Sequence, residues 1–111
     1  MQITIRPAQG KWVVRAAGAI IGESDRALEL IEADLPPVIY FPREDIAMAF
    51  LDRSDTVTFC PHKGSAVHFT VVGKSNRIED AAWSYETPDQ SVAAIAGHLA
   101  FYPDKVTIEC L

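Results

Sequence analysis

Closely spaced prolines and glycines are the strongest constraint on what this chain can fold into. Seven prolines and six glycines are scattered through 111 residues, separated by short runs rich in β-branched and aromatic residues. Proline and glycine end regular elements, whereas valine, isoleucine, threonine and the aromatic residues favour strands. The sequence therefore predicts a mainly β fold built from many short strands. The expected strands cover Gln2–Ile5, Trp12–Ala16, Ala19–Gly22, Ala27–Glu32, Val38–Phe41, Phe50–Asp52, Thr56–Cys60, Ala66–Val72, Ala82–Glu86 and Val106–Cys110.

One helix is expected in the C-terminal part of the chain. Thr87-Pro88-Asp89-Gln90 has the spacing of a capping box, in which the Thr87 side chain accepts a hydrogen bond from the Gln90 amide. Proline fits the first helical position, and Gly97 can end the helix in a left-handed conformation. We therefore predict a single short α-helix over residues 88–96.

The composition indicates one domain over residues 1–111. Hydrophobic residues make up 49% of the chain, which excludes a disordered protein, and no Gly/Ser-rich or Pro-rich stretch marks a linker. A domain of this length buries roughly two-thirds of its unfolded surface, so it can fold without disulfides or metals.

Charge and hydropathy exclude two classes of partner. Ten basic and fifteen acidic residues give 10 − 15 = −5, whereas nucleic-acid binding relies on clustered Lys and Arg. The longest strictly apolar run, Ile46–Leu51, has six residues, and a membrane-spanning helix needs about twenty. We therefore expect no nucleic acid and no membrane as a partner. The N-terminal residues lack a secretory pattern, which predicts a cytoplasmic protein.

The two cysteines, Cys60 and Cys110, are expected to be free thiols because the cytosol is reducing. No Cys-x-x-Cys pair is present, so a structural zinc site is not predicted. We expect neither a metal nor a cofactor.

The strands before and after Pro61 are expected to form a hairpin. Val57 and Phe59 are the apolar residues of the first strand, and Val67 and Phe69 are those of the second. Because directly paired residues point to the same face, this pattern predicts that Phe59 pairs with Val67 and Val57 with Phe69. The loop between the strands would then have five residues, 61–65.

The opposite face of this hairpin is polar and carries two chemically able side chains. In the predicted register, Cys60 and His68 are diagonal neighbours with Cβ atoms about 7 Å apart. Lys63 in the loop supplies a nearby cation, which favours the thiolate form of a cysteine. Cys60 is therefore a candidate nucleophile, with His68 or His98 as its base. Alternatively, Cys60 is only a small hydrophobic residue under the loop. The polar face of the hairpin is then the solvated face of the sheet.

Four segments of the sequence carry more specific information about the protein family than the amino-acid composition does. They are Tyr40-Phe41-Pro42-Arg43-Glu44-Asp45, Cys60-Pro61-His62-Lys63-Gly64, Ala82-Trp83-Ser84-Tyr85, and Ala96-Gly97-His98-Leu99-Ala100-Phe101-Tyr102. In order and spacing they resemble a small bacterial family known as a domain of unknown function, DUF427, from about Trp12 to Ile108. The resemblance implies a β-tent or Mss4-like fold with two small antiparallel sheets. Relatives of that architecture include zinc-bearing domains, whose paired cysteines are missing here, and domains with ligand pockets lined by aromatic residues.

Several residues of these segments are candidates for a ligand site. Trp83 and Tyr85 lie two residues apart and therefore share a face of their strand. They can form the aromatic wall of a ligand pocket, or they can simply pack in the core. Arg43 can clamp an anionic group or join a surface ion-pair network. His98 follows the expected helix end and can act as a general acid or bond the last carbonyls. Tyr102, four residues further on, can join His98 or can simply pack in the core.

The sequence therefore predicts a small-molecule-binding domain with an aromatic and basic pocket. Arg43, Lys63, Trp83, Tyr85 and Tyr102 are its expected ligand-binding residues, and its ligand is not identified by the sequence. If the pocket is also catalytic, Cys60 and His98 are the expected catalytic residues. The alternative is a structural or protein-interaction module whose motifs only hold turns and sheets together.

Overall fold

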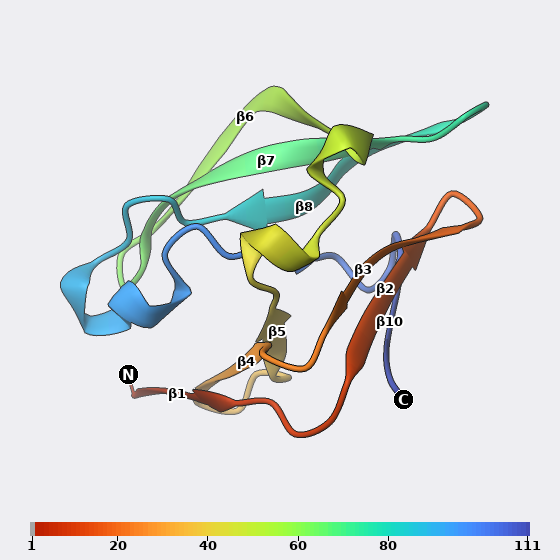
Figure 1. Ribbon diagram of the computed structural model, residues 1–111. Helices are drawn as coiled ribbons and strands as arrows, with labels where there is room; N and C mark the ends of the chain where they lie inside the picture. Colours follow the sequence, from red (N-terminus) through yellow and green to blue (C-terminus); the bar gives the residue numbers. More distant parts are fainter. Residues whose placement is uncertain (1) are drawn as a thin grey trace.

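Three small antiparallel sheets make up most of the computed structural model, which describes residues 2–111 (Figure 1). The largest sheet has the strand order β6-β7-β8-β9, and each of the other two has three strands. Their members are β6 (Leu51–Cys60), β7 (Gly64–Val72), β8 (Arg77–Ser84) and β9 (Ala100–Phe101); β1 (Ile3–Pro7), β4 (Leu28–Glu32) and β5 (Val38–Tyr40); and β10 (Thr107–Cys110), β2 (Trp12–Ala16) and β3 (Ala19–Ser24). The mainly β prediction is confirmed, but the sheets number three and not the two that the resemblance implied.

The four-stranded sheet is packed on both of its faces. Phe69 and Phe101 belong to one buried cluster, which also contains residues of β2 and β3. Ala66 and Ala100 belong to a second cluster, which contains residues of β4 and β5. Since neighbouring residues of a strand point to opposite faces, the two small sheets cover different faces of the large one. Figure 1 shows β6, β7 and β8 of the large sheet at the top, the strands β1, β4 and β5 at the lower left and centre, and β2, β3 and β10 on the right.

The predicted α-helix is a 3₁₀ helix, η3 (Gln90–Ile95). Asp89, and not Thr87, caps it by accepting a hydrogen bond from the Ser91 amide at 3.0 Å. Val92 departs from helical geometry with φ −123° and ψ 28°, and both Val92 and Ile95 are buried. Residues three apart lie on one face of a 3₁₀ helix, so this form turns both side chains into the core. Two further 3₁₀ turns, η1 (Arg43–Asp45) and η2 (Met48–Phe50), precede β6. Among residues 2–111, no helix is long and apolar enough to cross a membrane.

The predicted register of the β6–β7 hairpin is wrong by two residues. Val57 pairs with Val67, and Phe59 pairs with Ser65. The cause lies in the turn, where the Lys63 amide donates to the Cys60 carbonyl at 3.2 Å and Gly64 takes a φ of +109°. A three-residue loop followed by a glycine at positive φ lets Gly64 pair with Cys60. Because the shift is an even number of residues, every side chain keeps its predicted face.

Most strands differ from the prediction by a few residues at one end, and the larger differences concern β6, β8 and β9. The segments expected at 50–52 and 56–60 are one strand, β6, with an irregular register between Arg53 and Val57. Ser54 and Thr56, in this irregular segment, both donate hydrogen bonds to Asp80 at 2.6 Å. Strand β8 begins at Arg77, earlier than expected, and the two-residue β9 was not predicted.

Candidate functional site

A cavity of about 260 Å³ lies between the β1-β4-β5 sheet and the four-stranded sheet. Four of the residues that the sequence predicted for a ligand pocket line it together, namely Lys63, Trp83, Tyr85 and Tyr102. They come from the β6–β7 turn, from β8 and its C-terminal end, and from the segment after β9. The small sheet contributes the facing wall, which includes Glu32 and Tyr40.

The pairing of the strands explains why these side chains meet. His68 pairs with Trp83, and Trp83 pairs with Ala100, so all three point to the same face of the large sheet. Thr58 shares this face because it pairs with Ala66, two residues before His68. Thr58 and Trp83 both line the cavity. The polar face that the sequence predicted is therefore the face that borders the cavity.

A buried ion pair joins the two walls of the cavity. Lys63 Nζ lies 2.6 Å from Glu32 Oε1, and the two side chains are only 10% and 12% exposed. Burial acts to lower the pKa of Lys63, but the hydrogen bond to Glu32 and the neighbouring groups outweigh it, so the pKa is raised. Lys63 therefore stays charged at neutral pH. Its ammonium group also lies 6.0 Å from the centre of the Tyr85 ring.

Trp83 is fixed by aromatic neighbours on two sides. Its ring centre lies 4.5 Å from that of Tyr102 and 6.3 Å from that of Tyr40, with the Tyr40 ring nearly perpendicular at 88°. The indole Nε1 donates a hydrogen bond to the Tyr40 hydroxyl oxygen at 3.3 Å. Tyr102 is held in turn by His68, whose Nε2 lies 3.0 Å from the Tyr102 hydroxyl. A wall fixed in this way loses little conformational entropy when a ligand packs against it.

The tyrosine hydroxyls of the cavity are protonated at neutral pH. Burial raises the pKa of Tyr40, of Tyr85 and of Tyr102, although Lys63 partly opposes the shift at Tyr85. Each hydroxyl can therefore donate a hydrogen bond as well as accept one. Together with Thr58 and Lys63 they make the cavity rich in donors.

Cys60 and His68 are not neighbours in the structure. Because Cys60 pairs with Gly64, His68 lies four residues further along β7, which is about 13 Å by the rise of a strand. Cys60 is half-buried against the second core cluster, and its thiol is free. The predicted diagonal contact depended on the wrong register and does not form.

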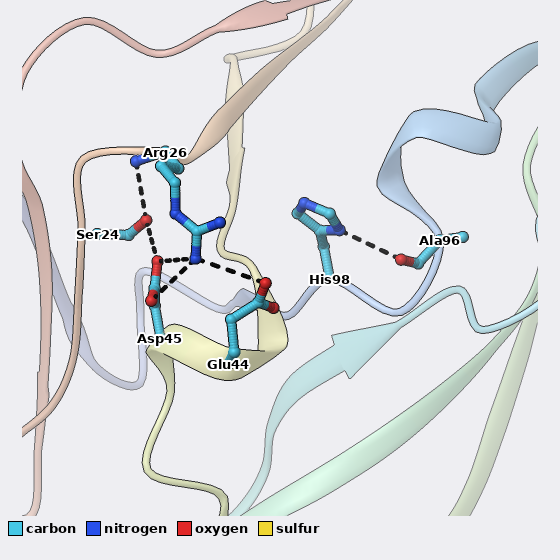
Figure 2. A network of polar contacts seen from close by, with 6 residues as sticks. All are labelled: Ser24, Arg26, Glu44, Asp45, Ala96 and His98. Carbon is cyan, nitrogen blue, oxygen red and sulfur yellow. Dashed lines mark hydrogen bonds and ion pairs between the residues drawn. The ribbon is translucent and has the colours of Figure 1, made fainter.

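Arg43 and His98 lie outside the cavity. The Arg43 guanidinium donates to the Gly97 carbonyl at 3.0 Å and to Glu86 at 3.1 Å. A bridge between Phe41 and Leu99 places His98 beside the start of η1, and His98 Nδ1 lies 3.2 Å from the Ala96 carbonyl oxygen (Figure 2). The structure thus separates these two residues from the four that line the cavity.

Residues 2–111 contain no group of three or more His, Cys, Asp or Glu side chains placed to hold a metal ion. Within this described part of the chain, the lining of the cavity includes no cysteine and no histidine. What the lining offers is hydrogen-bonding groups, an ion pair and aromatic surface.

The comparison with known proteins identifies the family. A family model described as a domain of unknown function, DUF427, matches residues 4–110. The chain belongs to the DUF427 family. A search of curated proteins found no match.

The four sequence segments that resemble DUF427 come together at the cavity. Each supplies at least one lining residue, in chain order Tyr40, Lys63, Trp83 with Tyr85, and Tyr102. These segments are far apart in sequence, so their convergence is a property of the fold. In this DUF427 domain each resembling segment therefore contributes to the cavity, although Arg43 and His98 of the same segments lie outside it.

Sequence reasoning missed Glu32 and did not assign Tyr40 to the site. A signal for Glu32 was present, because Leu28, Leu30 and Glu32 alternate along β4 and must share a face. Glu32 pairs with Ile3, and Leu30 pairs with Val38, so a carboxylate takes an inward position on an otherwise apolar face. No pattern in the sequence indicated that Lys63 would be its partner.

Proposed function

We propose that this DUF427 domain binds a small molecule in the cavity between the β1-β4-β5 sheet and the four-stranded sheet. The ligand's ring or flat apolar part packs against Trp83, and its polar atoms bond Lys63, Thr58 and the tyrosine hydroxyls. The proposal is for binding, with no chemical step assigned.

The observation that carries the proposal is the Lys63–Glu32 pair at 2.6 Å, almost wholly buried in a cavity wall. Taking two charges out of water costs several kcal/mol per ion, and apolar residues at such positions often give equal or greater stability. A fold alone therefore has little need of this pair. A ligand that forms hydrogen bonds with the Lys63 ammonium and the Glu32 carboxylate would explain why the pair is present.

The remaining hydrogen-bonding capacity of Lys63 supports the same view. An ammonium group has three donors, and among residues 2–111 only Glu32 is within hydrogen-bond distance of Lys63 Nζ. Two donors are therefore available at the cavity. The fixed aromatic wall beside them matches the usual form of small-molecule sites, which combine apolar surface with a few placed polar groups.

A thermal-shift screen with nucleosides, sugars, amino acids and aromatic acids tests the proposal. A ligand present at one hundred times its Kd stabilises the folded state by about 2.7 kcal/mol, which is a readily measured rise in Tm. The decisive variant is Lys63→Met with Glu32→Leu, which removes both charges together and is expected to fold. Its matched control is Arg15→Met with Glu109→Leu, because that pair is also 2.6 Å long but is exposed and lies outside the cavity.

We expect the ligand-induced rise in Tm to be lost in the Lys63/Glu32 double variant and kept in the control. If no compound stabilises the wild-type protein, or if the double variant responds as the wild type does, the cavity is not the site. The alternative of a structural or protein-interaction module would then be favoured.

A further inference from the structure

A second concavity adjoins the proposed site and differs from it in chemistry. It is a groove of about 590 Å³ whose lining is largely apolar and includes Trp12, Ile39, Phe101 and Ile108. These residues come from β2, β5, β9 and β10, so the groove crosses from the first small sheet to the second. Both tryptophans of the chain line it.

The groove and the cavity have a common rim. Leu35, Pro36, Val38 and Trp83 line both of them. Leu35 is 58% exposed, so its apolar side chain is accessible on this rim. The adjoining residues Pro36 and Pro37 fix their own φ angles, so this rim is preformed. A molecule seated in the cavity can therefore continue past Trp83 into the groove.

The charges of the two concavities are balanced separately. In the cavity, Lys63 is neutralised by Glu32 at 2.6 Å. In the groove the charged lining residue is Glu29, which is paired with Arg6 at 2.8 Å. An anionic head group would therefore meet the Glu32 carboxylate with no free cation to compensate it. An uncharged head group with an oxygen acceptor can take the spare Lys63 donors without that repulsion.

We propose that the ligand is an uncharged amphipathic molecule, with an oxygen-bearing head in the cavity and an apolar tail in the groove. This inference rests on the proposed function and adds the chemical class of the ligand. The head bonds Lys63 and Thr58, and the tail passes Leu35 and Trp83 to lie against the apolar residues of the groove. Burial of the tail supplies affinity in proportion to its length.

A homologous series of 1-alkanols, from butan-1-ol to nonan-1-ol, measures this dependence through tryptophan fluorescence. Each buried methylene contributes about 0.8 kcal/mol, so the Kd should fall about fourfold per added carbon until the groove is filled. The sodium carboxylates of the same lengths should bind at least tenfold more weakly. The variant Leu35→Asp places a charge on the rim, and Ile20→Asp is its control, because Ile20 is also an exposed hydrophobic residue but lines neither concavity.

We expect Leu35→Asp to abolish the dependence on chain length while short alcohols still bind, and Ile20→Asp to behave as the wild type. Equal Kd values along the series, with binding still lost in the Lys63/Glu32 double variant, would overturn the amphipathic ligand and leave the cavity as the site. A length dependence that survives Leu35→Asp would show unspecific adsorption and also overturn the inference. If no alcohol binds and the metabolite screen is negative as well, the proposed function fails together with it.

Discussion

A buried ion pair and an exposed ion-pair network of the protein differ in what surrounds them. Lys63 and Glu32 meet at 2.6 Å in a cavity wall, with both side chains almost wholly buried. Arg26 meets Asp45 at 3.2 Å, but its own side chain is 58% exposed, and Ser24 adds a hydrogen bond to Asp45 at 2.7 Å (Figure 2). The exposed network joins the end of β3 to η1 and is explained by that link alone. The buried pair has no such link to explain its desolvation cost, and the proposed binding site is based on this difference.

The largest expected effect comes from separating the buried pair. Lys63→Met leaves the Glu32 carboxylate without its cation, and we expect the free energy of unfolding to fall by about 3 kcal/mol or more. Adding Glu32→Leu should restore most of the loss, because the uncompensated charge is removed. Urea unfolding of the two single variants and the double variant measures the coupling. A loss below about 1 kcal/mol for Lys63→Met would show that this pair behaves like a surface pair.

The second-largest effect is expected at Gly22, where β3 packs closely against the segment that carries Asp45. A Cβ atom at Gly22 would lie 2.4 Å from Ile46 Cδ1 and 3.2 Å from the Asp45 carbonyl oxygen. Gly22→Ala should therefore lower the free energy of unfolding by about 2 kcal/mol, in the range found for overpacked cores. Thermal unfolding measures the loss. An unchanged Tm would mean that the end of the Ile46 side chain, or η1 itself, can move away from β3 without cost.

A smaller loss of stability is expected when the hydrogen bond between Tyr102 and His68 is removed. Tyr102→Phe keeps the ring beside Trp83 but removes the hydroxyl that bonds His68 Nε2. His68 is only 2% exposed, so the loss of its partner should cost about 1 kcal/mol. Urea unfolding gives the size of the effect, and His68→Phe in the same background should recover part of it. A Tyr102→Phe variant as stable as the wild type would show that this hydrogen bond does not hold the wall.

The smallest effect concerns Asp45. The hydrogen bond from Ser24, aided by Arg26, holds the pKa of Asp45 below its ordinary value. A depressed pKa contributes stability above the ordinary aspartate range, near pH 4, and this contribution is lost as the pH falls through the lowered pKa. Asp45→Asn should therefore cost about 1 kcal/mol or less at pH 7. The difference from the wild type should disappear in strong acid.

Thermal unfolding from pH 7 to pH 2 follows this difference. The variant Asp34→Asn is a suitable control, because Asp34 is exposed and takes no part in the network. A difference between Asp45→Asn and the wild type that stays constant across the pH range would contradict the assigned cause.

The mainly β fold could be predicted because proline and glycine act locally, and the polar face of β6 and β7 could be predicted because side chains alternate along a strand. The register could not, since the conformation of Gly64 decided it and apolar pairing did not. Val57 and Phe59 are 61% and 72% exposed, so they exert little of the pressure that the prediction assumed. Similarly, the form of η3 is set by the burial of Val92 and Ile95, which a local capping pattern does not describe.

Part of the site could also be predicted, because four of its residues lie in segments that resemble a known family. Lys63, Trp83, Tyr85 and Tyr102 belong to segments with a family resemblance, and the fold brings them to one cavity. The pairing of Lys63 with Glu32 joins residues 31 positions apart on different sheets, and no local rule indicates such a contact. Cys60 and His68 were placed together only by a register that the turn does not allow.

The pairing of β10 with β2 affects how the molecule reaches its native state. Arg15 and Glu109 are in contact although they are 94 positions apart, and the two-residue strand β9 with Tyr102 also follows most of the sequence. Chains dominated by such long-range strand pairing fold in milliseconds to seconds, far more slowly than helical bundles. During synthesis, the aromatic wall of the cavity is incomplete until Tyr102 has left the ribosome. The cavity is thus one of the last parts of the molecule to be completed as the chain is synthesised.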